Sequence, residues 1–408
     1  MNIYLFENKS ETLNLEPLSL TRPSFDLRCG VFSVLERIRL ELPDAHISLF
    51  VREELADVVR ERFPEQEVNP GGVEAALWLN SRALWRKRII DTMLPFENTV
   101  FFAQENFVGA ILDREIGEKW LNRGGPVATR PQTPLASENI SVECPVYLWD
   151  YVHANGKVIT EDSALFDLGS SKGTIDSGVH LLNEAQLYLG SGSRVKSGAV
   201  LDAEGGPVII GQEVTVLPGA FLEGPLVIGD GTLIKAGARI YGGTTIGPGC
   251  KIGGEVTESI FQSWSNKQHD GFIGNAFIGE WVNLGADTNN SDLKNNYTNV
   301  KVTVNGEVVD SGSLFVGLFM GDHSKTGINT MFNTGTAVGP GSNIVGYGFP
   351  PRTIAPFSWM VNGRRRIHLL EKFMLAARVA KERRNQHIST VEEQFYKRLF
   401  QDAGLNSS

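Results

Sequence analysis

The sequence is poor in the residues that disulfide frameworks and metal motifs need. Its three cysteines, Cys29, Cys144 and Cys250, are odd in number and lie far apart. This spacing predicts neither a disulfide framework nor a zinc motif, and it is typical of a protein in a reducing compartment. The chain does not open with a basic segment followed by an apolar run, and no apolar stretch is long enough to cross a bilayer. We therefore expect a cytoplasmic protein with no membrane partner.

An excess of positive charge is also missing. The chain has 38 Lys and Arg against 47 Asp and Glu, which gives a net charge of −9. Proteins that bind nucleic acids present a basic face, so this balance argues against a nucleic-acid partner. Local basic pockets for phosphates remain compatible with it. A length of 408 residues, of which 41% are hydrophobic, predicts two or more globular domains.

What the sequence does contain is a strict six-residue repeat. From Val208 to Gly254 the third position of every hexad is aliphatic, namely Ile210, Val216, Leu222, Ile228, Ile234, Ile240, Ile246 and Ile252. A helix needs apolar residues spaced by three and four, and an exposed strand needs them spaced by two. A period of six fits neither and is typical of a parallel β-helix, in which each hexad supplies one short strand and one turn.

The repeat divides the chain into three predicted domains. Residues 1–165 alternate strands and helices, which predicts a mostly parallel α/β sheet with ligands at the strand C-termini. The predicted strands are Ile3–Phe6, Ile47–Val51, Ala75–Leu79 and Thr99–Phe102, and the predicted helices are Val31–Leu42, Glu53–Phe63 and Pro145–Asn155. Residues 166–350 are predicted to form the β-helix. Residues 351–408 are predicted to be helical, and they either cap the open end of the β-helix or lie across a neighbouring subunit.

The repeat fails at two places. In the first, residues 255–271, Glu258 occupies an expected aliphatic position, which predicts an insertion or an irregular coil. The second, residues 287–313, includes a predicted hairpin with its turn at Asn305-Gly306. Because a regular β-helix is only a scaffold, we expect chemistry at such breaks.

His269 lies in the polar segment of the first break. A neutral imidazole there can accept the proton of an amine or hydroxyl that attacks a thioester. A surface histidine in a loop is an equally good interpretation. His323, beside Asp322, is an alternative base or a structural residue. Lys267 and Lys294 are candidates for phosphate binding, although lone lysines are more often solvated surface charges.

The whole chain up to about residue 360 resembles a divergent, GlmU-like form of the bifunctional bacterial enzyme that makes UDP-N-acetylglucosamine. The segments that carry the resemblance are LTRP at 20–23, SNKQHDG at 265–271, NLGADTNNSDLKNN at 283–296 and GLFMGDHSKTGINTMFNTGT at 317–336. The resemblance implies a left-handed β-helix, a homotrimer with active sites between subunits, and acetyl-CoA as the acyl donor. Two departures from the better-known family are Phe272, where that family has tyrosine, and Asp287, where it has glycine.

The resemblance also implies roles for individual residues. It implies His269 as the base and Asn283 as a contact near the reacting amine. The remaining predicted contacts are Lys267, Lys294 and Tyr297 for the sugar phosphate and Ala286, Asp322, His323 and Ser324 for acetyl-CoA.

The N-terminal domain is similar to a nucleotidyltransferase fold, through residues 15–23 followed by Gly30. The usual glycine-rich loop is absent, Ser24 replaces a lysine, and Arg82 stands where a metal-binding aspartate is expected. A basic residue cannot ligate Mg²⁺, so Mg²⁺ and UTP are expected only if this domain transfers nucleotides by a rearranged site. Arg22, Arg28 and Arg82, with Asn80, are predicted either to bind phosphate or to form structural ion pairs.

We interpret the chain as an N-acetyltransferase that acts on an amino-sugar phosphate resembling glucosamine 1-phosphate. The N-terminal domain would add sugar-1-phosphate nucleotidyltransferase activity that forms UDP-N-acetylglucosamine. One alternative is a degenerate N-terminal domain with acetyl transfer only. Another is a scaffold that binds sugar nucleotides without catalysis.

Overall fold

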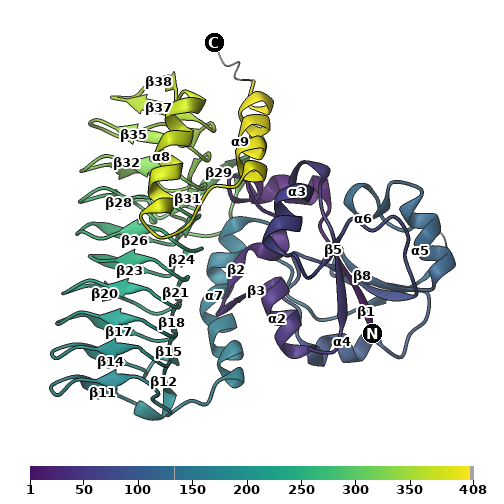
Figure 1. The fold of residues 1–408 in the computed structure, drawn as a ribbon, viewed down its shortest axis with the longest axis horizontal. Helices are drawn as coiled ribbons and strands as arrows, with labels where there is room; N and C mark the ends of the chain where they lie inside the picture. Colours follow the sequence, from purple (N-terminus) through teal and green to yellow (C-terminus); the bar gives the residue numbers. More distant parts are fainter. Residues whose placement is uncertain (133, 405–408) are drawn as a thin grey trace.

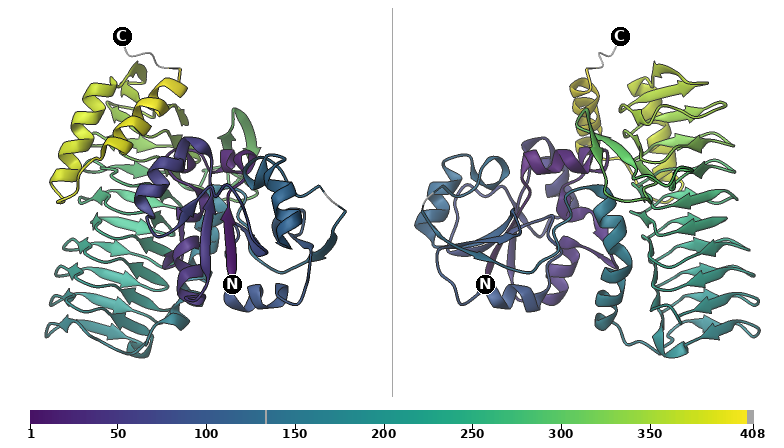
Figure 2. Two further views of the ribbon diagram at one scale, coloured as in Figure 1. Left: turned by 45° about the vertical axis from the view of Figure 1, so that its right-hand side comes forward. Right: turned by 180° about the vertical axis from the view of Figure 1, so that it is seen from behind.

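The computed structural model describes residues 1–132 and 134–404 of the chain. It shows an N-terminal α/β domain beside an upright column of β-strand coils, with one long helix between them (Figure 1). Two further helices run along the upper part of the column (Figure 2). Among the described residues, no helix is both long and apolar enough to cross a membrane.

One seven-stranded mixed sheet forms the centre of the N-terminal domain. In spatial order its strands are β5 (Glu67–Val68), β4 (His46–Phe50), β1 (Asn2–Phe6), β6 (Ala76–Asn80), β8 (Asn106–Leu112), β7 (Thr99–Ala103) and β9 (Ala136–Asn139). β1 pairs in parallel with β4 and β6, as the alternation of strands and helices predicts. β8, which that alternation does not predict, is antiparallel to β7, because a connection of only two residues makes a hairpin.

Helices cover both faces of this sheet because its strands alternate their side chains. Ile3 and Leu5 belong to one buried cluster, whereas Tyr4 and Phe6 belong to another on the opposite face. The helices of the domain are α1 (Lys9–Thr12), α2 (Val34–Glu41), α3 (Glu53–Arg62), α4 (Lys87–Met93), α5 (Arg114–Leu121), α6 (Gly125–Ala128) and α7 (Leu148–Asp162). Three 3₁₀ turns (Leu13–Leu15, Leu18–Leu20 and Ser24–Asp26) and a small hairpin of β2 (Arg28–Cys29) and β3 (Phe32–Ser33) follow β1 and α1.

The column is the predicted left-handed parallel β-helix, and each coil passes through three faces. Face 1 holds β12 (Leu187–Leu189), β15 (Val208–Ile210), β18 (Leu226–Ile228), β21 (Thr244–Ile246), β24 (Ile260–Phe261), β27 (Phe277–Ile278), β31 (Leu318–Met320), β34 (Thr336–Val338) and β36 (Thr353–Ile354). Face 2 holds β10 (Thr174–Ile175), β13 (Arg194–Val195), β16 (Thr215–Val216), β19 (Leu233–Ile234), β22 (Lys251–Ile252), β25 (Asn266–Lys267), β32 (Lys325–Thr326), β35 (Asn343–Val345) and β37 (Ser358–Val361). Face 3 holds β11 (His180–Leu182), β14 (Val200–Asp202), β17 (Phe221–Glu223), β20 (Arg239–Ile240), β23 (Glu255–Thr257), β26 (Phe272–Gly274), β28 (Asn289–Asn290) and β33 (Met331–Phe332).

Two of the three edges of the column carry predicted site residues. We name the edge between faces 1 and 2 corner A, and the edge between faces 2 and 3 corner B. The predicted aliphatic ladder fills the interior between them, since every residue of the ladder from Ile210 to Ile252 is at most 1% exposed. The ladder is therefore confirmed, and it makes the column a rigid frame for both corners.

The coil at residues 255–271 is complete, so the prediction of an insertion or irregular segment there is wrong. β23, β24 and β25 pair in parallel with the coil below. The coil is merely shorter: Ile252 pairs with Lys267, fifteen residues on, whereas Ile234 pairs with Ile252, eighteen residues on. Glu258 lies in the shortened turn, at φ 42°, and not in an interior position. On face 3 the next interior residue is Ile273, which pairs with Val256 of the coil below.

The second break leaves the column as a hairpin, as predicted. Its strands are β29 (Lys301–Val304) and β30 (Glu307–Asp310), and Asn305 and Gly306 form the turn with φ of 52° and 79°. The hairpin projects from the column toward the N-terminal domain (Figure 2). Val302 and Val304 are buried in the core that the two domains share.

The column continues beyond residue 351, where the sequence pattern predicts helix. β36 and β37 add a further coil, and β38 (Arg364–Ile367) folds back antiparallel on β37. Helices α8 (Leu370–Glu382) and α9 (Thr390–Asp402) follow. They do not cap the open end of the column: α8 lies along its side, and α9 stands between the column and α3 (Figure 1). The capping box of α9 is formed by Ser389 and Glu392.

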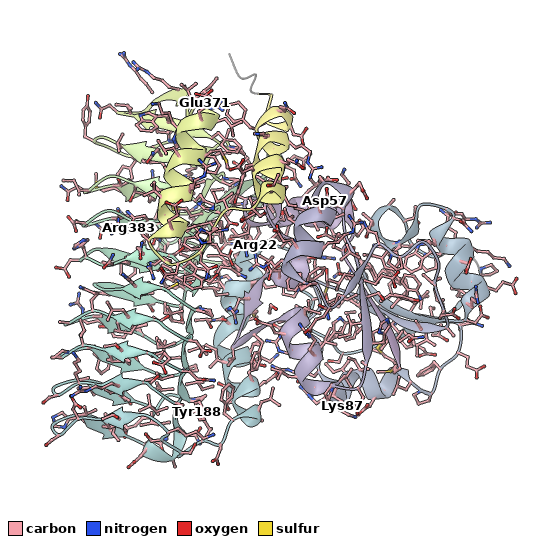
Figure 3. The ribbon with its side chains drawn as sticks, in the orientation of Figure 1. Arg22, Asp57, Lys87, Tyr188, Glu371 and Arg383 are labelled. Atoms are coloured by element: carbon pink, nitrogen blue, oxygen red, sulfur yellow. The ribbon has the colours of Figure 1, made fainter. Side chains whose placement is uncertain are left out.

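The two domains are joined by buried polar contacts as well as by apolar packing. The side chain of Asn155 in α7 donates to the carbonyl of Gly243 at 2.8 Å and accepts from the backbone N–H of Gly30 at 2.7 Å. Thr245 of face 1 donates to the carbonyl of Gly30 at 2.9 Å. Figure 3 places Arg22 at the same junction, higher along the column. Such satisfied polar contacts fix the relative orientation of the two domains.

Candidate functional site

His269 lies at corner B, in the turn between β25 and β26. Its side chain is exposed and makes no side-chain hydrogen bond within the described part of the chain. The neighbouring Asp270 is exposed as well. The imidazole therefore projects from a rigid edge and is free to contact a ligand, which agrees with the predicted location of the base at a polar turn.

Lys267 holds this turn in place from inside the column. It occupies the interior position between Ile252 and Leu284, and its side chain is 1% exposed. The ammonium donates to the carbonyls of Gly253 at 2.8 Å and of His269 at 3.0 Å. Burial lowers the pKa of Lys267 to about 8. The predicted contact with a sugar phosphate does not fit this geometry, because the ammonium is enclosed by the column and already donates to two carbonyls.

The glycine below the turn leaves room for this arrangement. Gly254 has φ 68°, and a Cβ there would lie 2.5 Å from the Lys267 ammonium and 2.7 Å from the His269 carbonyl oxygen. The coil above supplies a second support through asparagine side chains. Asn289 accepts from the backbone N–H of Phe272 at 2.8 Å, and Asn290 binds both backbone groups of Gly274. Corner B is thus fixed from below, from inside and from above.

Asn283 and Ala286 belong to the coil directly above His269. Asn283 lies on face 2 above Asn266, is exposed, and accepts from the Asn266 amide at 3.3 Å. Ala286 lies at corner B itself, and its carbonyl accepts from Asn329 of the next coil. The structure therefore brings His269, Asn283 and Ala286 to one region of the surface.

Lys294 and Tyr297 leave the column at the opposite end of face 3. They follow β28 in the second break, where the Lys294 ammonium donates to Thr298 at 3.0 Å and the Tyr297 ring is 71% exposed. Within one chain they do not line corner B with His269. Their predicted contact with the sugar phosphate stays a prediction.

Asp322, His323 and Ser324 lie at corner A, away from His269. Asp322 accepts from Arg22 at 2.5 Å and from Thr21 at 2.7 Å, so it is part of the domain junction. His323 is 2% exposed, and Ser324 donates to the Gly339 carbonyl inside the column. Within one chain these residues therefore do not lie beside His269, because corners A and B are different edges of the column. Their predicted contact with acetyl-CoA stays a prediction.

The predicted phosphate-binding cluster of arginines is also wrong, and the structural ion pairs are the correct alternative. Arg22 pairs with Asp26, Glu280 and Asp322 at 3.1, 3.3 and 2.5 Å. Arg28 pairs with Glu36 at 3.2 Å and donates to the Val31 carbonyl. Arg82 pairs with Glu11 at 3.1 Å, and Asn80 donates to the same carboxylate at 2.8 Å. Each guanidinium already has its own anion, so the three do not converge on a common phosphate.

Protein side chains also fill the C-terminal end of β1, where a parallel sheet usually binds its ligand. Glu7 is fully buried and accepts from the backbone and the side chain of Arg52, both at 3.0 Å. Ser24 and Ser81 bond each other across the same edge. Glu7 and Glu11 are both neutralised by arginines, and the described residues hold no group of three His, Cys, Asp or Glu suited to a metal ion. These side chains therefore do not fit a Mg²⁺ ligand set.

The two roles that sequence reasoning missed are the interior lysine and the aromatic edge at corner A. One coil of fifteen residues leads from Ile252 to Lys267. A shortened repeat in the sequence would therefore have indicated the interior lysine. Trp264 and Trp281 stack at corner A with ring centroids 5.4 Å apart. Their spacing of about one coil was visible in the sequence.

Comparisons with known proteins agree with this architecture. Residues 3–171 match the family model described as "Sugar nucleotidyl transferase", and residues 225–257 match "Bacterial transferase hexapeptide (six repeats)". The nucleotidyltransferase-like fold and the hexapeptide β-helix are therefore confirmed.

Two characterised relatives match shorter parts of the chain. The "Bifunctional sugar-1-phosphate nucleotidylyltransferase/acetyltransferase" of Sulfurisphaera tokodaii is 38% identical over 109 residues, which are 24% of this chain and 27% of the relative. The "Bifunctional protein GlmU" of Methanocaldococcus jannaschii is 35% identical over 85 residues, 21% of each chain. The matches thus span about a quarter of the relatives, and the predicted resemblance to the GlmU-like proteins is confirmed over that span.

Among solved structures, a UDP-N-acetylglucosamine acyltransferase from Arabidopsis is 13% identical. The match covers 57% of this chain and 90% of that one, with a TM-score of 0.21, which is too low to support an argument.

Proposed function

We propose that this chain is an acetyl-CoA-dependent N-acetyltransferase that acts on an amino-sugar phosphate at corner B. The observation that carries the proposal is the exposed imidazole of His269 on an edge that Lys267 fixes from inside the column. A hexapeptide β-helix and two relatives named for acetyl transfer or as GlmU support the same reaction class.

In this mechanism neutral His269 accepts a proton from the sugar amine as the nitrogen attacks the thioester carbonyl. The new C–N bond forms while the C–S bond breaks, and the imidazolium then returns the proton to the coenzyme A thiolate. Backbone N–H groups of the coil stabilise the negative charge that develops on the carbonyl oxygen. Lys267 acts as a positioning residue, since it holds the backbone carbonyl of His269 and does not reach the surface.

A homotrimer would complete this site. Corner B of one chain is an open edge without an opposing wall, whereas Lys294 and Tyr297 project from the far end of face 3. If three columns pack side by side, the second break of a neighbour can supply these residues to His269. Cytoplasmic location, with its supply of acetyl-CoA and sugar phosphates, is part of the same proposal.

The test is thiol release from acetyl-CoA with glucosamine 1-phosphate as the acceptor. The change His269→Ala should lower kcat by about 10²- to 10⁴-fold, the usual contribution of a general base. The matched control is His180→Ala, because His180 is also an exposed histidine of the column. Full activity of His269→Ala would refute the assignment.

A second activity, nucleotidyl transfer by the N-terminal domain, is favoured by the family match over residues 3–171. Since the C-terminal end of β1 is filled, the more open candidate is a cavity of about 700 Å³ beside β7 and β9, lined in part by Asn106, Asn139, Glu143 and Lys157. Pyrophosphate release from UTP and N-acetylglucosamine 1-phosphate with Mg²⁺ tests it. If no pyrophosphate is released while acetyl transfer is intact, the N-terminal domain is degenerate. If the chain does not bind acetyl-CoA, it is a non-catalytic scaffold.

A further inference from the structure

A cavity of about 410 Å³ lies at corner A, where three parts of the chain meet. The loop of Thr21–Pro23 and helix α3 form one wall, the corner of the column forms the second, and the segment from the end of α8 into α9 forms the third. This volume lies within the range of pockets that hold small molecules. The cavity belongs to a different edge of the column from the one that carries His269.

Corner A carries bulky aromatic residues where the fold favours glycine. In successive coils the corner position has positive φ, and it is glycine at Gly231 and Gly249, with φ of 65° and 67°. In the next three coils it is Trp264, Trp281 and His323, with φ of 55°, 59° and 59°. A non-glycine residue in this conformation costs about 1–3 kcal/mol, and such strain is concentrated at functional sites.

The three rings form a continuous stack beside the cavity. The Trp264 and Trp281 rings are 5.4 Å apart and inclined by 4°, and the Trp281 and His323 rings are 6.1 Å apart and inclined by 13°. The stack begins over Gly249, where a Cβ would lie 2.4 Å from the Trp264 ring. All three rings line the cavity. Glu213 and Phe357 also have positive φ at this corner, 54° and 51°, so the aromatic stack rather than the strain alone distinguishes these three coils.

One buried polar atom of this stack lacks a partner within the described part of the chain. Nδ1 of His323 is buried and makes no hydrogen bond. Burial, and then the nearby Lys325 and Lys381, hold the pKa of His323 well below its usual range, so the neutral ring keeps one acceptor nitrogen. Leaving a buried polar atom unpaired costs free energy, and a hydroxyl or amine of a ligand would satisfy it.

The charges of the cavity favour a cation over an anion. Its lining has three cationic side chains, Arg22, Arg62 and Lys381, and four anionic ones, Glu61, Glu280, Asp322 and Glu392. Arg62 binds Glu280 at 2.8 Å, Arg22 binds Asp322, and Lys381 binds Glu392 at 2.6 Å. These pairs engage all three cations and three of the four carboxylates. Among the described residues Glu61 is the lining carboxylate without an ion pair, and it accepts only from the Ser389 hydroxyl at 2.6 Å. A phosphate would add negative charge to a lining that is anionic on balance.

From these features we propose that the cavity at corner A is a second ligand site, which binds a small amine-bearing polyol of the amino-sugar class. Glu61 receives the ammonium group, and the aromatic stack with His323 receives the hydroxyl-bearing ring. Aromatic rings attract cations as well, as the position of Lys381 over the Trp281 ring at 5.7 Å already shows. This site goes beyond the proposed acetyl transfer and does not depend on it.

Calorimetric titration of the full chain tests the proposal, with glucosamine, N-acetylglucosamine and inorganic phosphate as probes. Glucosamine should bind saturably. N-acetylglucosamine, which lacks the ammonium, should bind at least tenfold more weakly, and phosphate should not bind. Absence of saturable glucosamine binding, or equal affinity for the acetylated sugar, would overturn the proposal.

Two variants that the backbone tolerates locate the site. Trp281→Gly restores the residue that lower coils have at this corner, and His323→Asn uses the non-glycine residue that accepts positive φ most readily. Each should weaken glucosamine binding at least tenfold while the chain keeps its circular dichroism spectrum. His269→Ala should leave binding unchanged. Undiminished binding in both corner A variants, or loss of binding in His269→Ala, would place the sugar at corner B and refute the second site.

Discussion

Replacing Lys267 by methionine should expose the free-energy cost of the ammonium inside the column. Met has a similar length and suits an interior position between Ile252 and Leu284. The change removes the charge and leaves the carbonyls of Gly253 and His269 without their donor. It therefore alters both the pH dependence of stability and the position of the proposed base.

The magnitude follows from the pKa of Lys267, which burial lowers from 10.5 to about 8. Because the folded pKa is depressed, the folded chain loses this proton first, and the unfolded chain binds more protons between pH 8 and 10.5. Stability therefore rises with pH in that window. By pH 10 the gain is roughly 2.5 kcal/mol, at about 1.4 kcal/mol per pKa unit. The variant lacks this gain. Between pH 7 and 10 the free energy of unfolding of the wild-type chain should therefore rise by that amount relative to that of the variant.

The assay is urea unfolding of both proteins at several values between pH 7 and 10. Lys325, whose pKa burial also lowers to about 8, is present in both proteins, so its effect cancels in the comparison. Lys301→Met, at an exposed lysine, is the control and should show a difference that does not change with pH. If the stability difference between the wild-type chain and Lys267→Met also does not change with pH, the reasoning is refuted. If Lys267 also positions His269, kcat for acetyl transfer at pH 7 should fall about tenfold with little change in KM.

Two further changes test the packing of corner A and the domain junction. Gly249→Ala should lower the free energy of unfolding by about 2–4 kcal/mol, through positive φ and a Cβ that lies 2.4 Å from the Trp264 ring. The control is Gly231→Ala, which has the same φ region but no atom within 4 Å of its Cβ, and it should lower the free energy of unfolding by only about 1 kcal/mol. Thermal unfolding measures both variants. Equal losses would argue against the close contact at Gly249. Asp322→Ala should lower the free energy of unfolding by about 3–5 kcal/mol, because buried Arg22 loses its shortest ion pair. Urea unfolding measures this loss. A loss under 1 kcal/mol would show that the pair does not hold the domains together.

The sequence predicted the column well because each coil repeats one local rule. The residues from Ile210 to Ile252 are interior because a period of six places them there, and no distant contact is needed to establish it. The same rule failed at Glu258 because that coil has fifteen residues instead of eighteen, and a fixed period of six cannot represent turns that are shorter. Lys267 consequently seemed to be a surface residue, although it takes the interior position that follows Ile252.

The side-chain environments at the domain junction could not be predicted in this way. Arg22 and Asp322 are 300 positions apart in the sequence, and only the docking of the N-terminal domain on corner A makes them partners. The motifs that contain His269 and His323 are similarly polar, yet their turns fall on different edges of the column. Periodicity gives the order of the turns, but the shortened coil and the hairpin excursion decide which edge each turn occupies.

The central claim, that acetyl transfer takes place beside His269, is tested most directly by a crystal structure of the chain with bound coenzyme A. We predict that coenzyme A lies along corner B with its sulfur within about 5 Å of the His269 ring, near enough for proton transfer directly or through one water. Coenzyme A bound at corner A beside His323, or elsewhere with His269 facing only solvent, would contradict the account.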